Sequence, residues 1–287
     1  MPPNREQLHH WIAQFLAEDI GRGDVTSQLV VPAGCQAHGR FVAREPMVLA
    51  GLPFAASVFS QVGSVVVVGW AADGDRISAQ DVIAELTGTA RDMLTGERVA
   101  LNLLQHLSGV ATLTRRYVDA VAGTNARIVD TRKTLPGLRA LQKYAVAIGG
   151  ASNHRFALDD GIMIKDNHIA AAGGLAKAVK AAQAGRPHLL RIELEVDSLA
   201  QLEEALTLDV DVVLLDNMSP AQVSEAVAMA NASKSRRPVL EASGGINLTT
   251  VRGYAEAGVD LISVGALTHS AVGVDIGLDL QTGTATP

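Results

Sequence analysis

The chain is poor in cysteine and in long apolar runs. Cys35 is the only cysteine among 287 residues, which excludes an intrachain disulfide and a cysteine-rich metal site. The most apolar short run, Val65 to Val68, is far below the roughly 20 residues needed to cross a bilayer. We therefore expect no membrane span and no membrane partner, and the cysteine usage fits the reducing cytoplasm.

An excess of positive charge is also missing. The formal net charge is −6, whereas proteins that bind nucleic acid in general carry diffuse positive charge to hold the phosphate backbone. The N-terminus lacks the basic start and apolar core of an export signal. It predicts instead an amphipathic helix with Leu8, Trp11, Ile12, Phe15 and Leu16 on one face. We expect a folded globular protein without a nucleic-acid partner, in which any basic site is local.

The first part of the chain predicts an α+β domain. Three strands are expected, at Arg40 to Arg44, Val65 to Val68 and Val82 to Leu86. The sequence Asp73-Gly74-Asp75 is a turn signal between two of them. A long helix is expected from Met93 through Val121, bridging into the second half. We place this domain at residues 1–108.

The second part alternates short apolar runs with Ala-rich helical stretches. The runs stand at Arg127 to Val129, Gly161 to Ile164, Ile192 to Val196, Val212 to Leu215, Val239 to Leu240 and Leu261 to Val264. Apolar strands that alternate with helices predict a parallel sheet buried on both faces. We expect closure into a β/α barrel, and because six or seven runs are present rather than eight, the barrel is expected to be incomplete.

Three cationic clusters follow these runs. They are Asp130-Thr131-Arg132-Lys133-Thr134, Asn153-His154-Arg155 and Lys165-Asp166-Asn167-His168. Any one cluster is more often a solvated loop end. Three of them at strand ends predict a polyanion site, because the chemistry of such barrels gathers where the strands end. Arginine binds planar carboxylates with two parallel bonds and lysine acts as a point charge, so together they predict a site for carboxylate and phosphate.

Two carboxylates, Glu195 and Asp216, each close a strand. A salt bridge or a helix cap is the commoner fate of such a residue. The functional alternative is that the pair accepts hydrogen bonds from sugar hydroxyls, or holds Mg²⁺ with the help of substrate phosphates. Glu193 lies two residues before Glu195 and points to the same side of the sheet, so it could take either role.

Glycine-containing turns follow the last two strands. Ser243-Gly244-Gly245 and Val264-Gly265-Ala266 stand where barrels commonly hold a phosphate with backbone N–H groups and a helix N-terminus. Glycine pairs are frequent in ordinary turns as well. Two such turns on adjacent strands strengthen the prediction of phosphate binding.

Histidines and a polar helix stripe leave alternatives open. Nearby positive charge lowers a histidine pKa, so His154 and His168 are expected to be neutral hydrogen-bond donors rather than general bases. Their spacing also argues against a histidine-rich metal site. Arg98, Asn102 and His106 form a stripe on the bridging helix. Such a stripe is usually solvated, but in a helix this apolar we expect it to face a subunit boundary or the site.

These motifs together resemble the quinolinate phosphoribosyltransferases, the carboxylating nicotinate-nucleotide pyrophosphorylases. The resemblance runs from about residue 12 to residue 280. Its most specific element is the long Asp-Thr-Arg-Lys-Thr segment. The motifs are Glu18-Asp19 through Thr26-Ser27, Asn102-Leu103-Leu104, His106 to Gly109, Asp130 to Arg139, Asn153 to Arg155, Lys165 to His168, Glu195-Val196-Asp197, Leu215-Asp216-Asn217 and Glu241 to Gly245.

The resemblance implies a fold and an assembly. The fold would be an open, mostly seven-stranded β/α barrel over residues 109–267. The N-terminal α+β domain of residues 1–108 would be completed by the C-terminal tail 268–287. The family is typically a homodimer with shared active sites, and by motif match Arg98 is the residue that reaches the partner's site.

The resemblance also implies roles for the site residues. Arg132, His154, Arg155 and Lys165 match the quinolinate pocket. Lys133 and His168, with Thr131 beside them, match the region of phosphoribosyl pyrophosphate. Glu195 and Asp216 match the ribose and Mg²⁺ region. The 5′-phosphate loops are Ser243, Gly244, Gly245, Val264, Gly265 and Ala266. The catalytic set is Lys133, Lys165, Glu195 and Asp216, and Mg²⁺ would be held mainly by the substrate pyrophosphate.

The implied reaction belongs to de novo NAD biosynthesis. Phosphoribosyl passes from phosphoribosyl pyrophosphate to quinolinate with loss of CO₂, giving nicotinate mononucleotide and pyrophosphate, and Lys165 is expected to assist the loss of CO₂. One alternative is a paralogue of the same fold associated with molybdenum transport. The other is a non-catalytic phosphate-binding or regulatory barrel, which loss of a catalytic cation would suggest; none of the matched cations is missing.

Overall fold

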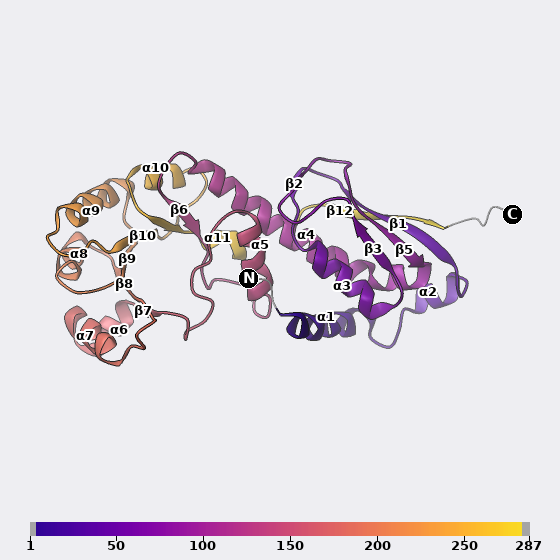
Figure 1. Ribbon diagram of the computed structural model, residues 1–287, viewed down its shortest axis with the longest axis horizontal. Helices are drawn as coiled ribbons and strands as arrows, with labels where there is room; N and C mark the ends of the chain where they lie inside the picture. Colours follow the sequence, from indigo (N-terminus) through magenta and orange to yellow (C-terminus); the bar gives the residue numbers. More distant parts are fainter. Residues whose placement is uncertain (1–3, 283–287) are drawn as a thin grey trace. The chain divides into compact units, whose positions relative to one another are not determined.

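The computed structural model describes residues 4–282, which form two compact units (Figure 1). One unit contains the chain up to Arg115, Ala140–Gly150 and the chain from Ala271. The other contains Arg116–Arg139 and Ala151–Ser270. The first unit carries an antiparallel sheet and the second a parallel sheet with helices, which confirms the predicted fold class.

The first unit is built on a four-stranded sheet in the order β12-β1-β5-β3. The strands are β1 (Gln36–Ala43), β3 (Val66–Gly69), β5 (Val82–Thr89) and β12 (Ile276–Thr282). Exposed and buried residues alternate along the first half of β1, as expected for a strand with one face toward a core. Strand β12 pairs with β1 from Ala43↔Ile276 to Ala37↔Thr282, so the C-terminal tail completes this sheet. The last part of the predicted tail, 283–287, lies outside the described residues.

Helices cover the buried face of this sheet. They include α1 (Arg5–Ile20), α3 (Leu52–Val62) and the long α4 (Ala90–Ala120). Helix α1 begins at the side chain of Asn4, which accepts a hydrogen bond from the Gln7 amide, and it buries Ile12 and Leu16 as its pattern predicted. The remaining elements are the short α2 (Val25–Val30) and the two-stranded pair of β2 (Met47–Val48) with β4 (Arg76–Ile77). None of the helices in residues 4–282 combines the length and apolar character that a membrane crossing requires.

Helix α5 (Arg139–Ile148) belongs mostly to the first unit, whereas the sequence assigned all of 109–267 to the barrel. Side-chain contacts explain the difference. The Tyr144 hydroxyl donates to Asp73 Oδ2 at 2.7 Å, and Asp73 also accepts the backbone N–H of Gly51 where α3 begins. Gln142 contacts His106 of α4 through their Nε2 atoms at 3.0 Å. An isolated amphipathic pattern does not reveal these partners.

The second unit is an open β/α barrel. Its strands are β6 (Arg127–Val129), β7 (Ile162–Ile164), β8 (Ile192–Val196), β9 (Val212–Asp216), β10 (Val239–Ser243) and β11 (Leu261–Ser263). They are parallel, in the order β6-β11-β10-β9-β8-β7, so the first strand pairs with the last as barrel closure requires. Within residues 4–282, a single bridge, Val129↔Ser152, continues the ring beyond β6, and the ring stays open beside β7. The predicted incomplete barrel is confirmed.

Helices follow the strands around the outside of the barrel (Figure 1). They are α6 (Asp166–Ala172), α7 (Leu175–Gly185), α8 (Leu199–Ala205), α9 (Pro220–Ala232), α10 (Val251–Glu256) and α11 (Ala266–His269). Strands β8 to β10 are mostly buried, because the helices cover one face and the barrel interior the other.

Cations at the N-terminal ends of the strands are matched by carboxylates. Asp211 accepts from the Ile192 amide at 2.9 Å and from Arg186 at 3.0 Å. Burial raises the pKa of Asp211, but these bonds and the charge of Arg236 outweigh burial, so the pKa lies below its ordinary value. Asp260 makes the same pair of contacts, with the Leu240 amide and Arg237. These paired cations are structural.

The C-terminal tail packs closely on α4. Gln105 donates from Nε2 to the Ile276 carbonyl at 2.8 Å, and its own carbonyl accepts from Val274 at 3.1 Å. Next to these bonds, a Cβ added at Gly109 would lie 2.1 Å from the Val272 carbonyl oxygen. Only glycine fits this approach without a shift of the backbone.

Replacing Gly109 should therefore detach the tail. We expect Gly109→Ala to lower the free energy of unfolding by about 2 kcal/mol or more, because backbone cannot move aside as a flexible side chain would. Gly185→Ala is the control: it also stands in a helix, but its Cβ meets nothing within 4 Å. Urea unfolding of both variants checks this, and equal stabilities would contradict it.

Candidate active site

A pocket of about 530 Å³ lies where the barrel strands end. Among the predicted site residues, it is lined by Thr131, Arg132, Lys133, His154, Arg155, Lys165, Glu195, Asp216, Ser243, Gly244 and Gly245. Sequence reasoning did not assign Met163, Leu214, Asn217, Glu241 and Ser263, which also line it. The residues converge because parallel strands place their carboxyl ends at one edge of the sheet.

A buried carboxylate, Asp130, positions the second cationic cluster. Asp130 follows β6 and is fully buried. It accepts from Asn153 Nδ2 at 2.7 Å and from the His154 amide at 2.7 Å. Such charge-assisted bonds are stronger than neutral ones. Asp130 thus fixes the start of the 151–161 segment.

Two guanidinium groups are partly withdrawn from water. Arg155 donates from Nη1 to the Gly161 carbonyl at 2.9 Å and contacts the Met163 sulfur at 3.5 Å. Burial lowers the pKa of Arg155, and the charge of Arg132 lowers it further, yet an arginine remains charged. Among the described residues, the buried Nε of Arg132 has no hydrogen-bond partner. An anion in the pocket would relieve the repulsion and occupy this donor.

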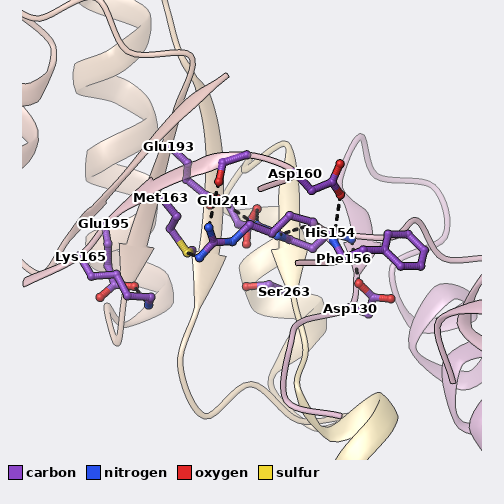
Figure 2. Close-up of polar contacts among 12 residues, drawn as sticks. Asp130, His154, Phe156, Asp160, Met163, Lys165, Glu193, Glu195, Glu241 and Ser263 are labelled. Carbon is purple, nitrogen blue, oxygen red and sulfur yellow. Dashed lines mark hydrogen bonds and ion pairs between the residues drawn. The ribbon is translucent and has the colours of Figure 1, made fainter. Parts of the chain in front are cut away.

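Lysines enter the pocket from two sides. Lys165 forms an ion pair with Glu195 at the ends of β7 and β8 (Figure 2). Lys133 is exposed, and its carbonyl accepts from the Thr268 hydroxyl at 2.8 Å. A Cβ at Gly265 would lie 2.9 Å from Lys133 Cδ, so glycine leaves room for this lysine. The lysine charges are therefore more mobile and more solvated than the two arginines.

The ends of β9 and β10 touch through their turns. The Asn217 amide donates to the Ser243 carbonyl at 2.9 Å, and Asn217 Nδ2 donates to Asp216 at 2.7 Å. Gly244 has φ +100°, and a Cβ there would lie 2.2 Å from Asn217 Oδ1. Glycine is required here both by the backbone conformation and by the close approach. The turn thus presents Asp216 and the Ser243–Gly245 backbone side by side.

His154 lies over two buried carboxylates (Figure 2). Its Nε2 is 3.1 Å from Glu193 Oε2 and 3.7 Å from Glu241 Oε2. Its Nδ1 accepts the Arg155 amide at 2.8 Å. Glu193 therefore contacts His154, while Glu195 contacts Lys165. Glu241 stands two residues before Ser243, the same strand spacing that aligned Glu193 with Glu195.

Some predicted site residues lie elsewhere. His168 is exposed on α6, where its Nδ1 accepts the Lys165 amide at 3.0 Å. Val264, Gly265 and Ala266 are not among the residues that line the pocket. Arg98 belongs to the other unit, exposed on α4 beside the exposed Asn102. In the same stripe His106 is half-buried, and burial lowers its pKa.

Both halves of the chain are similar to domains of known proteins. Residues 24–108 match the family model of the quinolinate phosphoribosyl transferase N-terminal domain, and residues 110–279 match that of its C-terminal domain. The chain belongs to the quinolinate phosphoribosyltransferase family. This confirms the family indicated by the motifs at the strand ends.

Individual members are similar over nearly their whole length. A nicotinate-nucleotide pyrophosphorylase (carboxylating) of Mycobacterium leprae is 47% identical, over 94% of this chain and 95% of that protein. A probable enzyme of the same name from Synechocystis is 44% identical, over 94% and 91%. The solved nicotinate-nucleotide pyrophosphorylase of Francisella tularensis superimposes with a TM-score of 0.91 at 38% identity, covering 97% of this chain and 98% of that one.

Removing Asp130 should loosen the 151–161 segment. We expect Asp130→Ala to lower the free energy of unfolding by about 3 kcal/mol, because it leaves buried donors without their charged acceptor. Asp160→Ala is the control: Asp160 accepts the Phe156 amide at 2.9 Å in the same segment, but it is exposed, so about 1 kcal/mol or less is expected. Denaturant unfolding of the two variants distinguishes them, and a larger loss at Asp160 would contradict this account.

Proposed function

We propose that the protein transfers phosphoribosyl from phosphoribosyl pyrophosphate to quinolinate and releases CO₂, forming nicotinate mononucleotide and pyrophosphate for NAD biosynthesis. The observation that supports this most is the convergence of Arg132, Lys133, Arg155 and Lys165 on one pocket of an otherwise acidic chain. The two substrates bring two carboxylates and several phosphate charges. Clustered cations replace the water that would otherwise solvate this charge.

The two arginines and Lys165 suit the quinolinate end of the pocket. Arg132 and Arg155 are partly desolvated, and a guanidinium binds a planar carboxylate through two parallel bonds. Lys165 is held by Glu195 within reach of the same space. Both ring nitrogens of His154 already contact the chain, one at Glu193 and the other at the Arg155 amide. His154 is therefore proposed to hold these neighbours in position rather than to bind the substrate with a charge.

The other side of the pocket suits the ribose and its phosphates. Glu195 and Asp216 offer acceptors for sugar hydroxyls, and the Ser243–Gly245 turn offers backbone N–H groups for the 5′-phosphate. Lys133 is exposed and mobile enough to follow a pyrophosphate group. The pyridine nitrogen attacks the anomeric carbon as pyrophosphate leaves, through an oxocarbenium-like transition state. The chain aligns the reactants and stabilises charge, with little covalent work.

Mg²⁺ is proposed to enter mainly on the pyrophosphate. Mg²⁺ prefers oxygen ligands and commonly uses one or two carboxylates together with substrate phosphates. The oxygens of Asp216 at the pocket wall fit this requirement, whereas Glu195 is already paired with Lys165. When bound, the ion would offset the negative charge of the leaving group.

The assembly is proposed to be a homodimer in the cytoplasm, with Arg98 serving the site of the partner. The exposure of Arg98 and Asn102 on α4 supports this, together with family membership. The comparisons do not favour the molybdenum-associated paralogue or a non-catalytic barrel, since the similar proteins named above are nicotinate-nucleotide pyrophosphorylases.

Nicotinate should be a very poor substrate. Its single carboxylate would leave one partly buried cation unpaired, which costs roughly 2–5 kcal/mol, or about 30-fold to several thousand-fold in kcat/KM. Steady-state assays with each acid, phosphoribosyl pyrophosphate and Mg²⁺ measure this ratio. Comparable kcat/KM values would refute quinolinate as the substrate.

The shared site can be tested by mixing two variants. Arg98→Ala and Lys165→Ala should each nearly abolish activity as homodimers. If Arg98 serves the partner, co-expression gives about half mixed dimers, each with one intact site, and activity returns to roughly a quarter of wild type. If Arg98 serves its own chain, every site keeps one defect. A mixture no more active than its parents would therefore refute the shared site.

A further inference from the structure

Three titratable residues lie together at the pocket, where His154 and Glu241 line it and Glu193 contacts His154, and none of them has been given a role in proton transfer. These are His154, Glu193 and Glu241, from the 151–161 segment, β8 and β10. The Glu241 side chain is only 1% exposed and that of Glu193 only 9%. In the described part of the chain, the Oε1 atoms of both carboxylates are buried without a hydrogen-bond partner. Buried polar atoms are rarely left unpaired, so these two call for an explanation.

A metal ion does not suit this cluster. His154 Nδ1 accepts the Arg155 amide, so in the neutral ring Nε2 carries the proton and donates it to Glu193. A protonated nitrogen has no lone pair for a metal. The guanidinium groups of Arg132 and Arg155, which line the same pocket, also disfavour a further cation.

The geometry instead indicates that Glu241, the more buried of the two carboxyl groups, holds a proton. One oxygen of each carboxylate and the imidazole nitrogen all lie within 4.8 Å of one another, and burial together with a like charge this close favours a proton on the more buried Glu241. The His154 Nε2–H is nearer to Glu193 than to Glu241, so it stabilises a negative charge on Glu241 less closely.

Other groups around Glu241 act on the same equilibrium. Burial raises the pKa of Glu241 to about 7, helped by the charge of Glu193 and opposed by His154 and the hydroxyl of Ser263 on β11. The neighbouring strand β9 contributes the uncharged Leu214 and, at its end, the carboxylate of Asp216, and the guanidinium groups of Arg132 and Arg155 line the same pocket. A dianionic substrate would raise the pKa of Glu241 further. A neutral carboxylic acid is therefore present near neutral pH.

The phosphoribosyl transfer with loss of CO₂ needs one acid. When the C–C bond to the 2-carboxylate breaks, its electron pair stays on C2 of the pyridinium ring, and C2 must then take a proton. Arg132, Arg155 and Lys133 are weak acids whose charges are needed for the anionic groups, and Lys165 is paired with Glu195. Glu241 borders the same pocket and is the stronger acid.

We propose that Glu241 is a catalytic acid, which transfers its proton to C2 as CO₂ leaves, with Glu193 and His154 as the residues that keep it protonated. The Glu241 carboxylate regains a proton from water after the product leaves, so the cycle is balanced. This inference rests on the proposed function and adds a role to a residue that the family motif includes but that the sequence left unassigned.

Glu241→Gln tests the role directly, because glutamine keeps the shape and polarity of the protonated acid but cannot supply the proton. In a single turnover with quinolinate, phosphoribosyl pyrophosphate and Mg²⁺, we expect pyrophosphate to form within about 3-fold of the wild-type rate. The later formation of CO₂ and nicotinate mononucleotide should be slower by about 100-fold, the usual size of a general-acid effect, and the dicarboxylated nucleotide should accumulate. If pyrophosphate and CO₂ form at unchanged rates, or slow equally, the proposal is overturned.

Glu193→Gln gives a second test that retains Glu241. It removes the neighbouring negative charge, so Glu241 should lose its proton at lower pH. Because the acid must be protonated, the rate of CO₂ formation in wild type should fall as pH rises through and above about 7. In Glu193→Gln this fall should begin at lower pH, with the full rate recovered on acidification. An unchanged pH profile contradicts the proposal, even if Glu241→Gln fails to fold.

Different results would refute the proposed function and the role of Glu241. If wild type forms no pyrophosphate from quinolinate and phosphoribosyl pyrophosphate, the proposed function is wrong. If wild type turns over normally and Glu241→Gln releases CO₂ as fast as pyrophosphate, only the role of Glu241 is wrong.

Discussion

Mutual repulsion among the cations at one mouth of the barrel is the constraint on which the site depends. Burial lowers the pKa of Arg155 and the charge of Arg132 lowers it further, whereas Glu193 and Asp160 raise it. Lys165 is paired with Glu195 from the next strand. Glu193 and Glu195 both come from β8, whereas Arg155 and Lys165 lie outside it, so these cations gain the two carboxylates as neighbours only in the folded barrel. In the free protein the carboxylates neutralise only part of the positive charge of the pocket, and an anionic substrate would neutralise more of it.

The carboxylates beneath this mouth differ in their surroundings, and the difference separates their roles. Glu195 and Asp216 border the pocket with part of their surface in water, which suits contacts with hydroxyls and a hydrated ion. Glu193 lies two residues before Glu195 on β8, and Glu241 lies two residues before Ser243 on β10; both are buried, and burial raises the pKa of Glu241. Residues two apart on a strand point to the same side of the sheet but can be buried to different extents. The greater burial of Glu241 is what raises its pKa.

Local sequence patterns were sufficient to predict much of the barrel and of its pocket. The expected barrel strands coincide with β6 to β11 within a few residues, since buried parallel strands are continuous apolar runs. The cationic clusters and their strand ends located most of the pocket wall. Helix α5 was misplaced relative to the compact units, because its bonds to Asp73 and His106 join segments about 70 and 40 residues away. Sequence analysis named Glu241 only as the first residue of the Glu241 to Gly245 motif and gave it no role.

The sequence by itself determined the family, the β/α alternation and which residues lie at strand ends, because these depend on the order of residue types along the chain. The tertiary structure alone decided which carboxylate contacts which cation, and that Glu193 and Glu241 face each other under His154. Those outcomes depend on the registers of β8 and β10 with β9, which lies between them, and on the path of the 151–161 segment. Distances between side chains from separate strands set desolvation and charge coupling, and no local pattern encodes them.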